Sequence, residues 1–232
     1  MAAKPKSTAP EVKAAPTPVR APSARDGLDI MEWVQVNSRM LGGAAAVVAV
    51  AAAGYWFYVR SQQIKTLNAE RSLIQAEQSL QAGNTALASS DLQRVVSRYK
   101  GTGAGAQAAM LLAQTDYGAN KYQDGIKALE DISGHAGGSE ASVQSLMGDG
   151  YSQLNKFADA AKAYERAAQS AEFDNERAYY RAKSARSYAA AGNTAEAKRL
   201  WTQLSTDQKA QSVAAEARVR LAELDAKRAG KS

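Results

Sequence analysis

The sequence has no cysteine, a single histidine and no proline after Pro22. The missing cysteine excludes disulfides, thiolate metal sites and a cysteine nucleophile. Because proline interrupts helices and alanine favours them, the proline-free, alanine-rich remainder is expected to be nearly all helical. Residues 1–27 differ, since they are rich in Pro, Ala, Lys, Ser and Thr and poor in large apolar groups. We expect them to form a disordered tail.

Residues that carry chemistry are sparse. His135 lies alone in a glycine-rich turn, so neither a Ser/His/Asp set nor a metal cluster can be built around it. The stretch 101–105 lacks the preceding strand and the Gly-Lys-Ser/Thr ending of a phosphate loop, which leaves a flexible connector. Asp149 and Glu165 are separate acids rather than a pair. We therefore expect no enzymatic activity, no cofactor, no metal and no small-molecule substrate.

The charge pattern argues against nucleic acid as a partner. The formal net charge is only +6. The basic residues do not form a stripe with interleaved aromatic residues, which a nucleic-acid interface would require.

One apolar segment has the length of a membrane span. Residues 40–59 carry no charge and lie between Arg39 and Arg60. Twenty helical residues extend about 30 Å, the thickness of a bilayer core. Trp33 before the segment and the aromatic run 55–58 at its end resemble interfacial belts. A buried helix of a soluble protein is the alternative, and such flanks argue against it.

The span is rich in small residues. Ala45, Ala49 and Ala53 fall on one helix face at intervals of four residues. This stripe is either a contact surface for another transmembrane helix or simply the result of an alanine-rich composition. Both interpretations stay open.

Charge on the two sides of the span predicts its orientation. Six Lys/Arg residues precede it, whereas Arg60, Lys65 and Arg71 follow it closely. The positive-inside rule then places the N-terminus in the cytoplasm. The apolar run is too long for a typical signal peptide, so we expect a retained anchor. The predicted protein is a single-pass bacterial inner-membrane protein, with residues 28–60 holding the span and residues 61–232 in the periplasm.

A repeat with a period near 36 residues organises the rest of the chain. The phrase 82–88 (Ala-Gly-Asn-Thr-Ala-Leu-Ala) returns as 191–197 with one change, and two similar turns lie between. The aligned positions are Thr85, Tyr122, Phe157 and Thr194. Such a period is typical of a helical repeat array. It predicts an all-α fold with four helix pairs and a closing helix: 62–82 with 85–99, 104–119 with 121–133, 139–154 with 156–171, 174–191 with 194–204, and 207–228.

The third pair matches the tetratricopeptide consensus, at Gly148, Tyr151, Phe157, Ala160, Tyr164 and Ala167. Gly148 and Ala160 are small where two helices of a pair would cross. The three aromatic residues are expected to fill the space between this pair and its neighbour. Asparagines in the turns are expected to adopt left-handed geometry or to cap the next helix. Ser205 with Gln208 suggests a capping box for the closing helix. Together these features predict a right-handed tetratricopeptide-like solenoid.

A curved array would present the first helix of each pair on its concave face. We call this the first-helix surface, and its predicted partner-binding residues are Gln107, Met110, Gln114, Ser142, Ser145, Asp149, Tyr179, Lys183 and Arg186, extended by Leu73 and Glu77. Its mixed polar and apolar character suits an extended or helical segment of another protein. A merely solvated face is the alternative.

The order of tail, span and repeat domain resembles the ancillary SecYEG translocon subunit family of bacterial inner-membrane proteins. The resemblance is carried by 32–33 (Glu-Trp) and 55–58 (Tyr-Trp-Phe-Tyr) around the span, and by the small-residue helix 100–113. The long Pro/Ala/Lys tail and the Ala/Gly-rich span depart from that family.

The resemblance implies a non-catalytic accessory factor of the protein-export translocon that hands secreted chains to periplasmic chaperones. Its partners would be translocon subunits and those chaperones. A structural or assembly subunit of another large bacterial inner-membrane complex is the alternative. An anchored enzyme, or a regulator of one, is a third class with weak support.

Overall fold

The computed structural model describes residue 31 and residues 33–229, apart from the side chains of 227–229. The predicted tail 1–27 lies outside the described residues. Every regular element of the described part is a helix, as expected. The chain forms two compact units, Met1–Tyr58 and Val59–Ser232.

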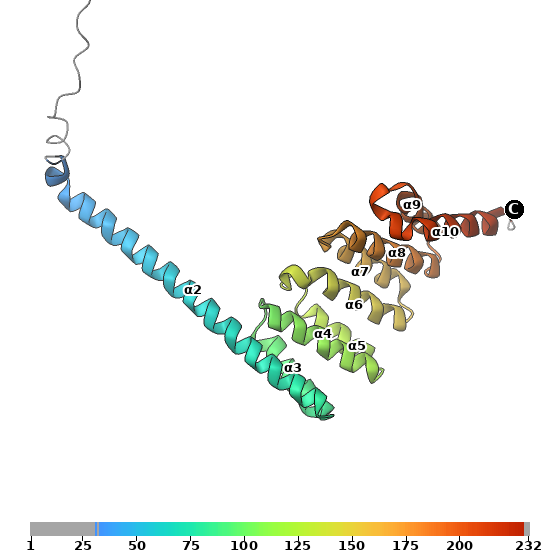
Figure 1. Cartoon of the computed structure of the whole chain (residues 1–232), viewed down its shortest axis with the longest axis horizontal. Coiled ribbons are helices and arrows are strands. Elements are labelled where there is room, and N and C mark those ends of the chain that lie inside the picture. Colours follow the sequence, from blue (N-terminus) through green and yellow to red (C-terminus); the bar gives the residue numbers. More distant parts are fainter. Residues whose placement is uncertain (1–30, 32, 230–232) are drawn as a thin grey trace, which may run out of the picture. The chain divides into compact units, whose positions relative to one another are not determined.

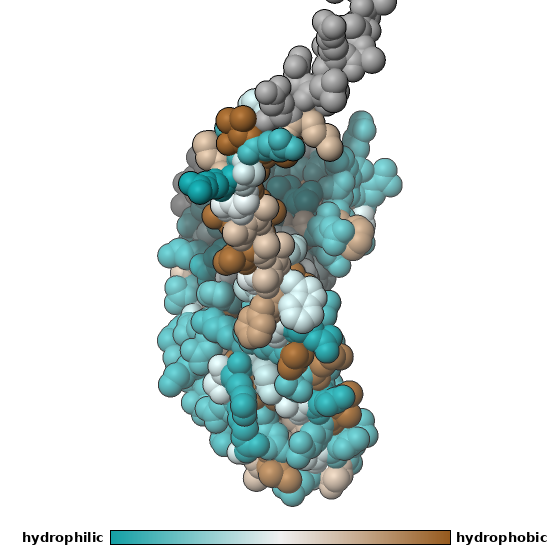
Figure 2. All heavy atoms as spheres, turned by 90° about the vertical axis from the view of Figure 1, so that its left-hand side faces the viewer, coloured by the Kyte–Doolittle hydropathy of each residue, from teal (hydrophilic) through white to brown (hydrophobic). Residues whose placement is uncertain are grey.

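The first unit holds the apolar part of helix α2 (Ser38–Gln81). Its large side chains lie open, with Val47, Val50 and Trp56 each about two-thirds to three-quarters exposed. Figure 2 shows tan, brown and white residues along this segment. The helix is long and apolar enough to cross a membrane.

The second unit stacks helices in the predicted pairs (Figure 1). After the end of α2 come α3 (Thr85–Arg98), α4 (Gly103–Gly118), α5 (Tyr122–Glu130), η1 (Gly137–Ser139), α6 (Glu140–Gln153), α7 (Phe157–Ser170), α8 (Asp174–Ala190), α9 (Thr194–Thr206), η2 (Gln208–Ala210) and α10 (Gln211–Ala229). From α3 onward, each α-helix packs against the next along the chain. The four aligned positions of the repeat are the first residues of α3, α5, α7 and α9, which confirms the predicted register.

The turns inside the pairs use one backbone conformation with two residue types. The residue two places before each second helix has a positive φ: 76° at Gly83, 59° at Asn120, 56° at Asn155 and 78° at Gly192. Glycine and asparagine tolerate this left-handed region better than other residues. Where glycine takes that place, the following asparagine is free to cap, and the Asn84 side chain accepts from Leu87 N–H at 3.3 Å. Both predicted roles of asparagine therefore occur.

Small residues let the helices approach. Gly148 lies so close to Tyr164 that a Cβ would stand 2.5 Å from the ring, and Ala160 is fully buried. Tyr164 therefore fills space inside its own pair, and its ring also meets the next pair, because Lys183 of α8 lies 4.6 Å from the ring centre. Tyr151 also reaches the neighbouring pair, since its hydroxyl donates to Glu130 of α5 at 2.8 Å.

The closing helix completes a second core cluster. Val213 and Ala217 of α10 are buried with Trp201 and Leu204 of α9 and the alanines of α8. The expected capping box at Ser205 and Gln208 is wrong. Ser205 lies inside α9 and donates to the Thr202 carbonyl at 2.8 Å. The cap is provided by Asp207, whose carboxylate accepts from Lys209 N–H at 2.9 Å.

The glycine-rich stretch 101–105 is a helix start rather than a flexible connector. Thr102 caps α4, accepting from Gly105 N–H at 3.0 Å and donating to the Tyr99 carbonyl at 2.8 Å. A Cβ on Gly105 would lie 2.5 Å from that carbonyl oxygen. Glycine is therefore required here by close packing of α3 on α4.

Candidate protein-binding surface

The first-helix surface is more closed than its sequence pattern predicts. Gln107, Gln114, Ser142, Tyr179 and Arg186 are exposed, whereas Met110, Asp149 and Lys183 are partly buried. Ser145 and Leu73 are buried, at 9% and 5% exposure, and do not contribute accessible surface. The helical period predicted that these two residues lie on the first-helix surface. In the structure, neighbouring helices cover them.

Several polar residues of this surface bind one another across successive first helices. Gln107 of α4 donates to Glu77 of α2 at 3.1 Å. Lys183 of α8 donates to Asp149 of α6 at 2.6 Å. Both contacts join successive repeats. These residues therefore stabilise the packing of one repeat on the next, in addition to giving the surface its polar character.

Asp149, Tyr164 and Lys183 interact with one another where α6, α7 and α8 meet. The buried Tyr164 hydroxyl donates to Asp149 at 2.5 Å, and the Lys183 ammonium lies 4.6 Å from the Tyr164 ring centre. Burial and the hydrogen bond to Asp149 raise the pKa of Tyr164 well above its ordinary value, so this phenol stays protonated. Lys183 also lies 5.6 Å from the ring centre of Tyr179, which is 48% exposed. At this point the charges of Lys183 and Asp149 balance each other, and the ring of Tyr179 is accessible to solvent.

A second contact joins α8 to the closing helix. The Arg186 guanidinium donates to both carboxylate oxygens of Glu216, at 2.7 and 2.5 Å. This hydrogen bond lowers the pKa of Glu216, against the effect of burial. Arg220 lies 3.6 Å from the same carboxylate, as the four-residue spacing predicts. No local sequence pattern predicts the pair of Arg186 and Glu216. The two residues are 30 positions apart and meet only because α10 packs against α8.

The accessible part of the first-helix surface is therefore a limited set. Gln114, Ser142 and Tyr179 are exposed and make none of the interhelix ion pairs described above, and Met110 is partly exposed. An aromatic ring, a thioether and neutral hydrogen-bonding groups can contact apolar side chains and backbone amides of a polypeptide.

The small-residue stripe of the span lies in the first unit. Ala45, Ala49 and Ala53 are exposed, and so are all other residues from 41 to 58. The structure therefore does not distinguish this face of α2 from the others, and the contact stripe stays a prediction.

The lone histidine lies where the sequence indicates, in the exposed turn before η1. Its Nδ1 is 3.2 Å from the Ser133 carbonyl oxygen. Glu140 organises this turn, accepting from Gly134 N–H at 2.8 Å and from the Ser133 hydroxyl at 3.2 Å. The turn is thereby attached to the start of α6.

Comparison with protein families gives one match. The model described as "Tetratricopeptide repeat-like domain" matches residues 31–146 and, in a second overlapping alignment, residues 72–184. Together the two alignments cover well over half of the chain. The first includes the apolar segment of α2. Comparison with curated proteins gives no match.

Proposed function

The chain belongs to the tetratricopeptide repeat-like domain family, and on that premise we propose that it is a membrane-anchored, non-catalytic scaffold that binds other proteins. The observation that carries the proposal is the combination, in one chain, of an unburied apolar helix of membrane length and an array of helix pairs. An exposed apolar helix of this size would aggregate in water but is stable in lipid. Arrays of this kind offer extended surfaces for other chains.

The proposed orientation has the N-terminus in the cytoplasm and residues 61–232 in the periplasm of a bacterial inner membrane. The bias of Lys and Arg toward the N-terminal side supports it. Because the chain has no cysteine, single cysteines report topology directly. In intact spheroplasts a membrane-impermeant maleimide should label Gln114→Cys, and it should label Ser23→Cys only after lysis. The opposite labelling pattern would overturn the orientation.

Within this class, an accessory role at the protein-export translocon is the function that the arrangement supports best. The exposed Gln114, Ser142 and Tyr179 would contact an emerging chain or a periplasmic chaperone, and the Ala45/Ala49/Ala53 stripe would lie beside a channel helix. The aromatic residues flanking the span and the helix at 100–113 support the role through their resemblance to that family.

Site-specific photo-crosslinking tests the translocon role. A benzophenone amino acid at Ala49 should crosslink to channel subunits, and one at Ser142 to secreted chains or periplasmic chaperones. The exposed Lys162 of α7 is the matched control and should give neither product. Recovery of a stoichiometric, unrelated inner-membrane complex would instead favour the alternative of a structural or assembly subunit. A preparation that yields neither channel subunits nor chaperones would exclude the translocon role.

A further inference from the structure

Two junctions between successive pairs share one hydrogen bond. Tyr151 near the end of α6 donates to Glu130 of α5 at 2.8 Å, and Tyr188 near the end of α8 donates to Glu165 of α7 at 3.0 Å. The positions are equivalent. Each tyrosine stands six residues before the next second helix, and each glutamate is the ninth residue of its own second helix. The two phenols thus bridge the junctions between the second and third and between the third and fourth pairs, and a cavity of about 360 Å³ remains beside Glu165 at the latter.

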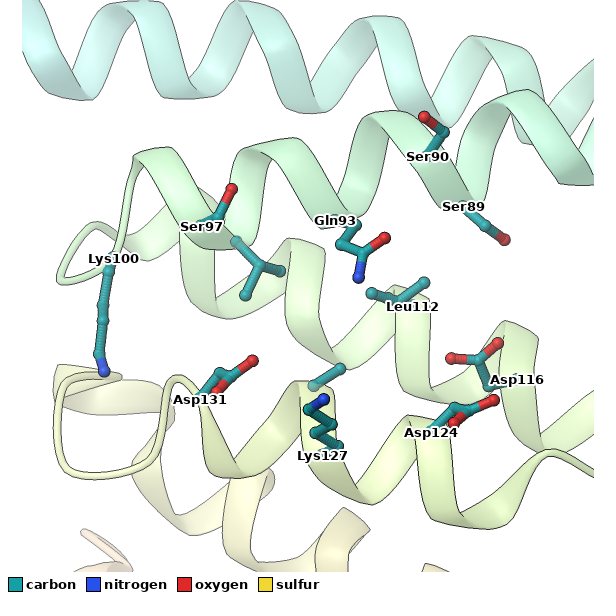
Figure 3. Close-up of a pocket in the computed structure, with 12 residues that line it drawn as sticks. Ser89, Ser90, Gln93, Ser97, Lys100, Leu112, Asp116, Asp124, Lys127 and Asp131 are labelled. Atoms are coloured by element: carbon teal, nitrogen blue, oxygen red, sulfur yellow. The ribbon is translucent and has the colours of Figure 1, made fainter.

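The first junction lacks this pair. The equivalent positions hold Asp116 in α4 and Gln93 in α3. A short carboxylate replaces the phenol, and an open groove of about 670 Å³ lies there, lined by both residues (Figure 3). The groove is larger than the other cavities described for this unit. We call it the α3–α5 groove, and its lining is Ser89, Ser90, Gln93, Val96, Ser97, Lys100, Leu112, Asp116, Asp124, Lys127, Ala128 and Asp131.

The adjacent tyrosine of α4 does not fill the groove. The Tyr117 hydroxyl donates to the Leu146 carbonyl of α6 at 3.1 Å. Its ring also occupies the space that a Cβ on Gly125 would need, and its hydroxyl the space beside Gly150. Tyr117 is therefore held toward α6.

The chemistry of the groove differs along its length. Asp116 and Asp124 lie together at one end, whereas Lys100 lies at the other, with Lys127 and Asp131 between them (Figure 3). Among residues 33–226, no side chain makes a hydrogen bond or ion pair with the Asp116 or Asp124 carboxylate, and the pKa of Asp116 is affected only by burial and by the charges of Asp124 and Lys121. Burial and the charge of Asp124 raise the pKa of Asp116, against a smaller opposing effect of Lys121. The two carboxylates thus lie in the cleft without a hydrogen bond or ion pair to a side chain of residues 33–226, although the charge of Lys121 acts on Asp116 and Lys127 belongs to the same lining.

We propose that the α3–α5 groove binds a segment of a partner protein that inserts an arginine side chain beside Asp116 and Asp124, in the space that tyrosine fills at the other junctions. The guanidinium can donate to both carboxylates at once, which an ammonium does less well. The apolar lining from Val96, Leu112 and Ala128 accepts the arginine stem. The hydroxyl and amide groups of Ser89, Ser90 and Gln93 line the groove where the partner's backbone would run. This site is separate from the first-helix surface and goes beyond the proposed function.

The test measures binding of a fluorescein-labelled nine-residue peptide, with arginine at the centre of an Ala/Ser background, to the full chain in detergent micelles. A peptide with citrulline in place of arginine keeps the shape and removes the charge. The arginine peptide should bind at least about tenfold more tightly than the citrulline peptide, because the lost charge-assisted hydrogen bonds set the difference.

Three protein variants locate the site. Asp116→Asn with Asp124→Asn should remove the preference for arginine. Glu70→Gln with Glu172→Gln removes the same charge from exposed positions outside the groove and should leave the preference unchanged. Asp116→Tyr with Gln93→Glu rebuilds the hydrogen bond of the other junctions, and it should abolish binding while raising the melting temperature.

Equal binding of the two peptides, or no binding of the arginine peptide up to about 1 mM, a weak affinity by any standard, would overturn the proposal. Undiminished binding by the Asp116→Tyr/Gln93→Glu protein would do so too. The Ser142 crosslinks of the proposed function should persist in the Asp116→Asn/Asp124→Asn protein. Each of the two proposals can thus fail without the other.

Discussion

Replacement of Gly148 by alanine should destabilise the array although it improves helix propensity. Gly148 lies inside α6, where alanine is favoured over glycine by about 1 kcal/mol. The added Cβ would lie 2.5, 2.7 and 2.8 Å from Cε1, Cδ1 and Cζ of Tyr164. Real Cβ atoms do not approach carbon this closely, so the ring or the helix must move.

The Tyr164 ring has little freedom to move. It is 3% exposed, its hydroxyl donates to Asp149 at 2.5 Å, and Lys183 lies over its face. Overpacking of a filled core costs about 1–3 kcal/mol, and displacing the phenol also weakens a hydrogen bond worth about 1 kcal/mol. After the propensity gain, the expected net loss is about 1–3 kcal/mol. For a domain of this size, the melting temperature should fall by about 2–12 °C.

Thermal unfolding of the full chain in detergent micelles, followed by circular dichroism, measures this change. Repeat arrays can unfold in parts, so amide hydrogen exchange of α6 and α7 should be followed as well. Gly118→Ala is the matched control, because a Cβ at this last residue of α4 meets no atom within 4 Å. The control should melt at the parent temperature or slightly above it. A Gly148→Ala protein that melts no lower than the parent would refute the packing argument.

Two further predictions concern the turns and the closing helix. Asn155→Ala should lower stability by about 1–2 kcal/mol in urea titration, because φ is 56° there, whereas Asn155→Gly should cost little; equal losses would contradict the role of the left-handed backbone. The ion pair between Glu216 and Arg186 should stabilise docking of α10 by less than about 1 kcal/mol, since both side chains are partly exposed. Because the hydrogen bond from Arg186 lowers the pKa of Glu216 below its ordinary 4.5, this stabilisation is present above pH 4.5 and is lost as pH falls through the lowered value. Thermal melts should find Glu216→Gln less stable than the parent at neutral pH and equal to it in acid, and a constant difference would contradict the assignment.

The turns inside the pairs and the starts of the second helices were readable from the residues alone, whereas the helix expected at 62–82 has no separate start and continues the span as part of α2. Left-handed backbone requires glycine or asparagine, and both recur at a period that local sequence displays. The membrane-length segment is readable for a similar reason, because its property is a run of uncharged residues. The family match agrees with these local features.

The binding surfaces needed the tertiary structure, because each depends on side chains that meet across different repeats. Ser142 and Ser145 look alike in the sequence, yet one is exposed and the other buried by neighbouring helices. Asp149, Lys183 and Arg186 have the composition of a ligand surface, but they bind residues of other helices of the same chain. The α3–α5 groove is larger than the cavity beside Glu165, and Asp116 lines it at the position where the later junctions have a tyrosine. A repeat pattern predicts at which positions similar side chains recur. Whether a cavity remains between two repeats depends on how the side chains of both repeats pack together, which the sequence pattern does not contain.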